Sequence, residues 1–307
     1  LPRQYESMKL FVEAEIRKMG KKNLWIGPSL GDWLAMGKGI AWQAMHNNPV
    51  SNAFIVHDLK VISETAERLG KKADADRYRR QLEATTKAYI EKFVSKKGIV
   101  AKDYQSAYIM ALKFVLPEGE LRELVKKNFA ANIRKNGLQT GFFATEHLLP
   151  LLVEAGETEL AYDILLQEGC PGWMYQIKCG ATTTWERWDA LKPDGTVNEE
   201  KMAGSGDNMV SFNHYAFGSV GEFYYQYILG IKPQKPGFAE LHFEPYPDRR
   251  LGGVSGSYLS RAGKIESSWK YEEDGCHISL NTPVKSEVVL PNGQRETVEE
   301  GTYQWLC

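Results

Sequence analysis

The chain has 307 residues, of which 43% are hydrophobic, so it can bury one large core or one large and one small core. Its 38 Lys and Arg residues nearly balance its 39 Asp and Glu residues, and the formal net charge is -1. Such a balance argues against a nucleic acid or an anionic membrane as partner, because neither is attracted without a basic field. No apolar run approaches the roughly 18 residues of a membrane helix, and we expect a globular protein with a neutral ligand.

The start of the chain and its cysteines say little about location. Leu1 is neither an initiator Met nor part of a signal-peptide pattern, so we expect a cut chain. The four cysteines lack zinc-site spacing and are expected to be free thiols, although Cys170 and Cys179 could pair in an oxidising compartment. Secreted, periplasmic and cytoplasmic locations all stay open.

The spacing of apolar residues from residue 1 to about 230 predicts a succession of helices. The clearest runs from Ser51 to Leu69, where apolar residues recur three and four apart before Gly70 ends it. The other expected helices are about 78–93, 104–116, 120–134, 144–154, 158–167 and 213–229. Short connections indicate antiparallel neighbours, and two helices that are apolar nearly all round, 106–115 and 142–153, suit the inner layer of a helical toroid.

Two other stretches break the helical pattern. Between Glu168 and Val210 the period lapses for about 40 residues, and loops of that length in compact domains are often functional. After Gly230 a Pro-rich linker leads into period-two alternation, and Pro291-Asn292-Gly293 predicts a hairpin. We therefore expect a helical domain at 1–232 and a small antiparallel β-sandwich of six or seven strands at 233–307.

The segment Gly180–Asp189 carries the most chemical information. It reads Gly-Ala-Thr-Thr-Thr-Trp-Glu-Arg-Trp-Asp, which sets Glu186 between Trp185 and Trp188 and beside Arg187. Indole rings cover the apolar face of a sugar, charged groups bind its hydroxyls, and a carboxylate can activate water. The alternative is a partly buried aromatic turn in which Glu186 and Arg187 simply pair.

A second cluster joins Asp32 to Trp33 in a loop bounded by glycine, and it offers a ligand for vicinal hydroxyls. Its structural alternative is an Asp that caps a helix, with Trp33 packed inward. A third lies at Ser211–Tyr215, where His214 at a helix start could point into a cavity or be a structural residue. Glu146 lies near the start of an expected helix, where the helix dipole would stabilise its charge, so we expect it to cap that helix. Gln105 could reach a ligand.

The histidines show no metal-ligand spacing, and neither a phosphate loop nor a Ser-His-Asp order is visible, so metal, nucleotide and cofactor roles are disfavoured. Six motifs nevertheless occur in the order found in bacterial α-L-rhamnosidases of glycoside hydrolase family 78, which this chain resembles over nearly its whole length. The motifs are Gly31-Asp32-Trp33, Tyr104 to Tyr108, Thr140-Gly141-Phe142, Gly180 to Trp188, Phe212 to Gly218, and Pro236-Gly237-Phe238. The Ala-Thr-Thr-x-Trp-Glu-x-Trp pattern is the specific one.

The resemblance implies an (α/α)6 barrel followed by a β-sandwich, and inverting hydrolysis of terminal α-L-rhamnose from a rhamnose-containing glycan or glycoside. Glu186 matches the family's general base. Trp33 and His214 would line the rhamnose pocket. The residues implied near that pocket are Asp32, Trp185, Arg187 and Trp188.

The family's general acid is not matched. It lies in an Asp-Glu-Arg-x-Gly-Trp segment upstream of Gly-Asp-Trp, and this sequence contains none. We also count about eight or nine helices where the barrel needs twelve. We therefore expect the carboxy-terminal part of a larger enzyme, with an open barrel whose apolar faces favour self-association. Two other classes stay open: another sugar-active helical toroid, such as a glycosidase or polysaccharide lyase, and a non-catalytic carbohydrate-binding remnant.

Overall fold

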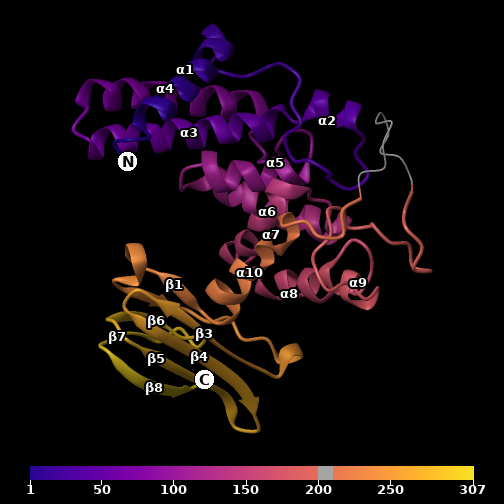
Figure 1. Ribbon diagram of the computed structural model, residues 1–307, viewed down its shortest axis with the longest axis vertical. Helices are drawn as coiled ribbons and strands as arrows, with labels where there is room; N and C mark the ends of the chain where they lie inside the picture. The colour runs from indigo at the N-terminus through magenta and orange to yellow at the C-terminus, as the bar shows by residue number, and fades with distance from the viewer. Residues whose placement is uncertain (200–209) are drawn as a thin grey trace. The chain divides into compact units, whose positions relative to one another are not determined.

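A computed structural model describes residues 1–199 and 210–307 (Figure 1). The chain forms two compact units, Leu1–Phe217 and Gly218–Cys307, each described by itself below. The first is helical and the second is built mainly of β-strands, as expected. Residues 200–209, at the end of the long segment between Glu168 and Val210, lie outside the described residues.

Helices follow one another through the first unit, mostly where the apolar periodicity placed them. They are α1 (Tyr5–Met19), α2 (Ile40–His46), α3 (Asn48–Arg68), α4 (Lys72–Phe93), α5 (Gln105–Met110), α6 (Glu120–Asn136), α7 (Phe142–Glu154), α8 (Thr158–Leu166) and α9 (Trp173–Lys178). A π-helical turn, η2 (Ala111–Val115), continues α5. Among the described residues, no helix combines the length and the apolar character that a membrane span requires.

The hairpin of α3 and α4 shows how the pattern produces the fold. Leu59, Ile62 and Ala66 of α3 are fully buried and pack in one cluster with Tyr78 of α4. Gly70 turns the chain between the two helices at a φ of +71°, a conformation that costs glycine least. The expected amphipathic helix and its glycine stop are both confirmed.

Two helical expectations differ from the structure. The long segment contains the helix α9, which at six residues is too short to show a helical period in the sequence. The single helix expected at 213–229 is divided into η3 (Ala216–Ser219), α10 (Val220–Phe223) and the π-helical η4 (Tyr224–Ile228). Gly218 and Gly221 weaken helix formation there, and His214 is held outside the helix by paired hydrogen bonds with Thr184.

The second unit contains eight strands among the described residues, in two four-stranded sheets. The strands are β1 (Ile231–Pro233), β2 (Leu241–Phe243), β3 (Gly253–Ser260), β4 (Gly263–Glu272), β5 (Gly275–Thr282), β6 (Ser286–Val289), β7 (Arg295–Val298) and β8 (Gly301–Leu306). One sheet has the order β1-β2-β6-β7 and the other β3-β4-β5-β8. The expected antiparallel pairing is confirmed between all neighbouring strands except β2 and β6. These two run parallel, because the chain forms β3 to β5 of the other sheet before it returns.

The period-two alternation in the sequence correctly predicted a strand with one buried face in this unit. In β4 the alternating residues Ile265, Ser267 and Trp269 are buried, and the indole N–H of Trp269 donates to the carbonyl of Ile228 at 2.7 Å. The turn Pro291-Asn292-Gly293 joins β6 to β7 in an antiparallel hairpin, with Gly293 at a φ of +87°. The expected hairpin is confirmed.

A cluster of charges bridges β1, β2 and β6. His242 contacts Glu244 through Nε2 and Glu287 through Nδ1, both at 3.3 Å, and Lys232 pairs with Glu244 at 3.2 Å. The hydrogen bond to Glu244 raises the pKa of His242, and the same bond lowers the pKa of Glu244 to about 2. Both side chains are largely buried, so the charged pair contributes to the stability of this unit.

This cluster predicts how stability depends on pH. The raised pKa of His242 gives stability that is complete below about pH 6.5 and is lost as the pH rises through the raised value. The lowered pKa of Glu244 gives stability that is complete above pH 4.5 and is lost as the pH falls towards 2. His242→Ala should therefore lower the free energy of unfolding by about 1 kcal/mol near pH 5.5 and by much less at pH 9.

Thermal unfolding across this pH range measures the effect. His277→Ala removes an exposed histidine that also pairs with carboxylates, and because water screens that pair the variant should shift the transition much less. A loss that is equal at both pH values would contradict the charged-pair explanation.

Candidate functional site

The segment Gly180–Asp189 follows α9 as a loop and is fixed by hydrogen bonds on several sides. The backbone N–H of Glu186 donates to the carbonyl of Ser211 at 2.8 Å, and that of Trp185 donates to the side chain of Gln176 at 3.3 Å. Thr184 exchanges two bonds with His214, at 2.9 and 2.6 Å. The loop is therefore held in one conformation against the segment 211–214.

Both tryptophans of the loop are core residues. Trp188 is 0% exposed, stacks on Phe217 at 3.7 Å and donates its indole N–H to the carbonyl of Thr140 at 3.1 Å. Trp185 is 3% exposed and packs its ring edge against Phe212. This corrects the expectation that they contact a sugar, because a ring whose faces are already covered offers no platform.

Arg187 is bound within the protein. Its guanidinium makes two parallel hydrogen bonds to Asp189, at 2.8 and 2.9 Å, and Asn198 also donates to Asp189 at 2.9 Å. Such a bidentate pair fixes the plane of the guanidinium. The alternative in which Arg187 pairs with Glu186 is thus not what the structure shows, and this pair also occupies the fork that we expected to hold sugar hydroxyls.

The carboxylate of Glu186 differs from its neighbours. The residue is only 9% exposed, yet within the described residues its side chain takes part in no hydrogen bond or ion pair. Both carboxylate oxygens therefore lack a protein donor among the described residues.

Asp32 is enclosed at the start of α7. One oxygen accepts from the backbone of Gly141 at 2.8 Å and from the Ser106 hydroxyl at 2.5 Å. The other accepts from the backbone N–H groups of Phe143 at 2.8 Å and Ala144 at 3.1 Å. Burial raises the pKa of Asp32, while these four bonds oppose that rise. Since Asp32 is 0% exposed, the expected contact with sugar hydroxyls is corrected: it caps a helix 110 residues away in sequence, not the one beside it.

Gln105 supports the same region and is not available to a ligand. Its side-chain oxygen accepts from the backbone of Gln139 at 2.8 Å, and its amide donates to Asn132 and to the carbonyl of Gly137. It thereby fixes the turn that leads into α7. Glu146 is exposed in α7, and the backbone N–H groups at the start of that helix donate to Asp32.

Trp33 and His214 meet through Phe142. The carbonyl of Trp33 accepts from the backbone N–H of Phe142 at 3.0 Å, and the ring of Phe142 lies 4.6 Å from that of His214. Trp33 and Phe142 line a cavity of about 740 Å³, and His214 is half-buried. These rings are open enough to contact a ligand, and both predicted roles stay proposals.

The short segment 140–142 contacts three of the sequence motifs: Gly31-Asp32-Trp33, the loop Gly180–Asp189 and the segment that contains His214. Thr140 binds Trp188, Gly141 binds Asp32, and Phe142 binds Trp33 and contacts His214. A Cβ at Gly141 would lie 2.1 Å from the carbonyl oxygen of Trp33, so only glycine fits. The motifs that the sequence separates are therefore joined at one point.

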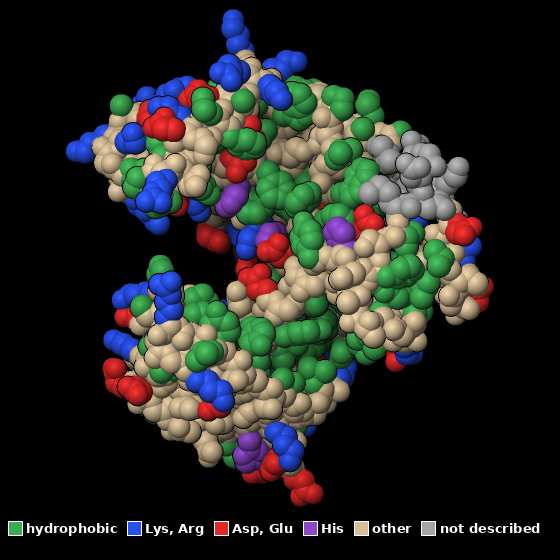
Figure 2. Space-filling model, viewed as in Figure 1, with side chains coloured by type: hydrophobic (Ala, Val, Ile, Leu, Met, Phe, Trp, Pro, Cys, Tyr) green, Lys and Arg blue, Asp and Glu red, His purple; other side chains and the backbone are tan. Residues whose placement is uncertain are grey.

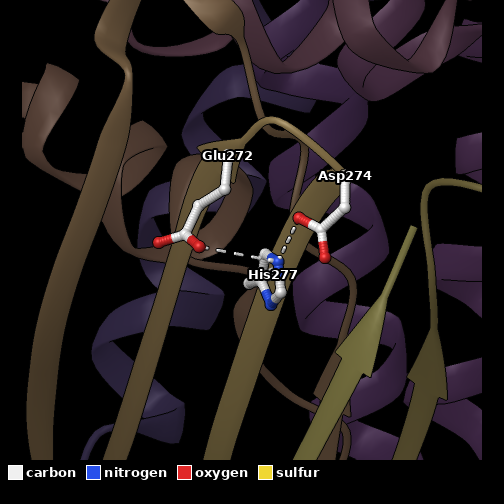
Figure 3. A group of neighbouring side chains, drawn as sticks. All are labelled: Glu272, Asp274 and His277. Atoms are coloured by element: carbon white, nitrogen blue, oxygen red, sulfur yellow. Dashed lines mark hydrogen bonds and ion pairs between the residues drawn. The ribbon is translucent and has the colours of Figure 1, made fainter.

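One group of potential metal ligands lies elsewhere, on β4 and β5 (Figure 3). Nε2 of His277 lies 2.7 Å from Asp274 and 3.8 Å from Glu272, and Lys270 pairs with Glu272. The hydrogen bond to Asp274 raises the pKa of His277, which favours the imidazolium. A protonated imidazole binds carboxylates and not a metal ion, so ion pairing explains this exposed group.

The four cysteines form no disulfide. Burial raises the pKa of Cys170 to about 11, so its thiol stays protonated at neutral pH and is a poor nucleophile.

Comparison with known families agrees with the site and the fold. Residues 1–228 match the bacterial alpha-L-rhamnosidase 6 hairpin glycosidase domain, and residues 230–304 match the bacterial alpha-L-rhamnosidase C-terminal domain. This chain belongs to the bacterial alpha-L-rhamnosidase family. The helical unit therefore lies within the match to the six-hairpin domain, and the strands of the second unit belong to the family's C-terminal domain.

Known alpha-L-rhamnosidases are similar over most of this chain. One from Alteromonas sp. (strain LOR) is 34% identical over 94% of it, and one from Streptomyces avermitilis is 32% identical over 89%. Native alpha-L-rhamnosidase from Aspergillus terreus matches 99% of the chain with a TM-score of 0.89 and 28% identity. The S. avermitilis enzyme complexed with L-rhamnose also matches 99%, with a TM-score of 0.87 and 28% identity. The chain spans 26% to 36% of the length of these relatives and solved structures.

Three residues of this rhamnosidase family member lie inside the motifs found in the sequence but had no role assigned to them there: Asp189, Ser106 and Phe142. Asp189 follows Arg187 by two residues, and that proximity was a usable sign of a local pair. Ser106 and Phe142 act only through contacts with distant segments, and no local pattern marks such contacts.

The buried carboxylate at α7 yields a stability prediction. Asp32→Asn replaces one acceptor oxygen by an NH₂ group that faces the N–H of Gly141, and it removes the charge that stabilises the helix N-terminus. We expect the free energy of unfolding to fall by about 2–4 kcal/mol in urea denaturation. Asp76→Asn, at an exposed ion pair with Arg79, is the matched control and should have no measurable effect. Equal stability of Asp32→Asn and the unchanged chain would contradict the capping role.

Proposed function

We propose that this chain carries the general base of an inverting α-L-rhamnosidase, and that Glu186 is this base. The observation that carries the proposal is the Glu186 carboxylate, which is nearly buried and unpaired among the described residues while Arg187 and Trp188 beside it are bound to protein groups. An unpaired carboxylate in a rigid loop is suited to take a proton from water. Membership in the rhamnosidase family and the relative solved with L-rhamnose support the substrate class.

The proposed reaction breaks the bond between the anomeric carbon of a terminal rhamnose and the glycosidic oxygen. Glu186 accepts a proton from water as the water oxygen bonds to that carbon from the opposite face. The leaving oxygen takes a proton from a general acid or departs as an anion. Rhamnose is released with inverted configuration. The base and the acid of such a pair stand roughly 6.5 to 9.5 Å apart.

The surrounding residues divide into two proposed roles. Trp33 and His214 contact the rhamnose, because their rings are partly open and are linked through Phe142. Asp32, Trp185, Arg187 and Trp188 hold the base and these rings in place without contacting the sugar. This division follows from which side chains are enclosed.

Within this chain, no described carboxyl group fits the general acid as well as Glu186 fits the base. Asp32 has both oxygens bound to protein donors. We propose that the acid comes from a segment of the polypeptide that is not among these 307 residues, in keeping with the fraction of its relatives that the chain spans.

The test uses substrates that differ in their need for an acid. In an aryl α-L-rhamnoside with a dinitrophenol leaving group, the dinitrophenolate departs without protonation. The oxygen of an alkyl rhamnoside must be protonated before it can leave. The chain should hydrolyse the activated substrate slowly and the alkyl rhamnoside about 10²- to 10⁴-fold more slowly still. Glu186→Gln should abolish the activated reaction, while the exposed-residue control Glu168→Gln should retain it.

The configuration of the first product, followed by NMR, distinguishes the mechanism. Release of β-L-rhamnose supports inversion, and α-L-rhamnose would contradict it. Sugar binding without any turnover, unchanged by Glu186→Gln, would assign the chain to carbohydrate binding instead.

A further inference from the structure

Two of the four cysteines lie directly opposite each other in the second unit. Strands β5 and β8 are antiparallel neighbours, and their pairing places His277 opposite Leu306. The next pair in this register is Cys276 and Cys307. The N–H of Cys276 donates to the carbonyl of Cys307 at 2.7 Å, and the N–H of Cys307 donates to the carbonyl of Cys276 at 3.0 Å. The two cysteines therefore form a hydrogen-bonded pair of the antiparallel ladder.

A pair of this kind has the separation that a disulfide requires. The Cα atoms of a hydrogen-bonded antiparallel pair lie about 5.5 Å apart, and those of disulfides usually lie about 4.4 to 6.8 Å apart. Residues directly opposite each other also point to the same face of a sheet. Cys276 alternates along β5 with Ile278 and Leu280, which are buried, so both thiols belong to the buried face of this sheet.

Closing the bond requires a small movement, which the position of Cys307 permits. Opposite Cβ atoms in a ladder lie about 4.5 to 5.5 Å apart, whereas a disulfide joins Cβ atoms about 3.5 to 4.5 Å apart, so the strands must approach by about 1 Å. Among the described strands, β8 is bonded to β5 alone, and Cys307 follows its last residue. A Cβ at Gly275 would lie 2.7 Å from the carbonyl oxygen of Cys307, so glycine leaves room for this close approach.

A reagent in water can reach the pair through Cys307. Cys276 is only 3% exposed, whereas Cys307 is partly exposed. The adjoining turn between β4 and β5 carries exposed ion pairs that include Glu272 and Asp274. Figure 2 shows acidic, basic and histidine side chains together at one end of this unit. Because Cys307 is the more accessible thiol, it is the one that reacts first with a dissolved reagent.

The charges around the pair also bear on its reactivity. Burial raises the pKa of Cys276 and the neighbouring Cys307 adds to the rise, while the charge of Arg249 opposes it. The guanidinium carbon of Arg249 lies 4.3 Å from the ring centre of Tyr271, which is the partner of Cys276 on β4. A cation in this position favours the thiolate form, which is the form that attacks a disulfide.

We propose that Cys276 and Cys307 are a dithiol that a low-molecular-weight disulfide oxidises to an intramolecular disulfide between β5 and the end of β8. The Cys307 thiolate bonds to one sulfur of the reagent, whose S–S bond breaks and releases a first thiolate. The Cys276 thiolate then bonds to the Cys307 sulfur and displaces the second. The two released thiolates take up the two cysteine protons, so the dithiol loses two electrons and the reagent gains them.

This bond makes the stability of the second unit depend on its redox surroundings. It closes a loop of about 30 residues that contains β6 and β7, and such a closure restricts the unfolded chain. It also holds the end of an edge strand, whose separation would expose unpaired backbone groups. The inference concerns the second unit alone and rests neither on Glu186 nor on turnover.

Peptide mapping tests for the bond. The intact chain is equilibrated with mixtures of oxidised and reduced glutathione and quenched with acid, and its remaining thiols are alkylated before digestion with trypsin. Cleavage after Lys270, Lys285 and Arg295 gives the peptides 271–285 and 296–307, each with one cysteine. We expect these peptides to be joined, with the loss of two hydrogen atoms, in oxidising mixtures and to be separate in reducing ones.

Thermal unfolding measures the consequence of the bond. In a calorimetric scan, we expect the second unit of the oxidised chain to unfold about 10 °C above that of the reduced chain. Cys307→Ser and Cys276→Ala should each remove this difference, while Cys179→Ser, in the helical unit, should keep it. Each variant is compared with itself in the two buffers, so the effect of the substitution on folding cancels.

Four results would overturn the inference. The first two are the absence of the joined peptides at every glutathione ratio, and the joining of Cys276 or Cys307 to Cys170 or Cys179 instead. The third is a redox-dependent difference in unfolding that persists in Cys307→Ser. The fourth is a glutathione adduct that stays on Cys307 while Cys276 remains open to alkylation, because the second exchange step would then not occur.

Discussion

The buried carboxylate of Asp32 at the start of α7 is the constraint on which the site depends. It binds three backbone N–H groups of a helix that begins 110 residues later, together with a hydroxyl from α5. A charged acceptor in this position satisfies the free donors of the helix and complements its dipole. Because α7 begins there and nowhere else, Phe142 has one position, and the rings of Trp33 and His214 are placed against it.

Neighbouring residues in the loop Gly180–Asp189 have opposite roles. Trp185 and Trp188 anchor the loop in the core, and the Arg187–Asp189 pair fixes its outgoing direction. Glu186 lies between these anchors with its carboxylate unbound by described residues. Rigid surroundings of this kind hold a carboxylate in place without neutralising it, which agrees with the general-base role that we propose for Glu186.

Much of the fold follows from sequence, and less of the site does. Stripes such as Leu59 and Ile62 and glycine stops such as Gly70 are local patterns, and they correctly placed most helices. Glu186 could be proposed from sequence because its aromatic setting is chemically unusual. The enclosure of Trp188 and the remote capping by Asp32 arise from contacts between distant segments. The parallel pairing of β2 with β6 has the same origin, since it depends on the path of the chain through the other sheet.

The hydrogen bonds from Glu186 to Ser211 and between Thr184 and His214 have a consequence for chain length. They tie together the two ends of the stretch from 187 to 210, so the closure of that stretch does not depend on what lies within it. Lengthening a loop whose ends are already joined costs little free energy. Insertions within this stretch can therefore be accommodated at little cost in stability while the backbone of Glu186 keeps its place against Ser211.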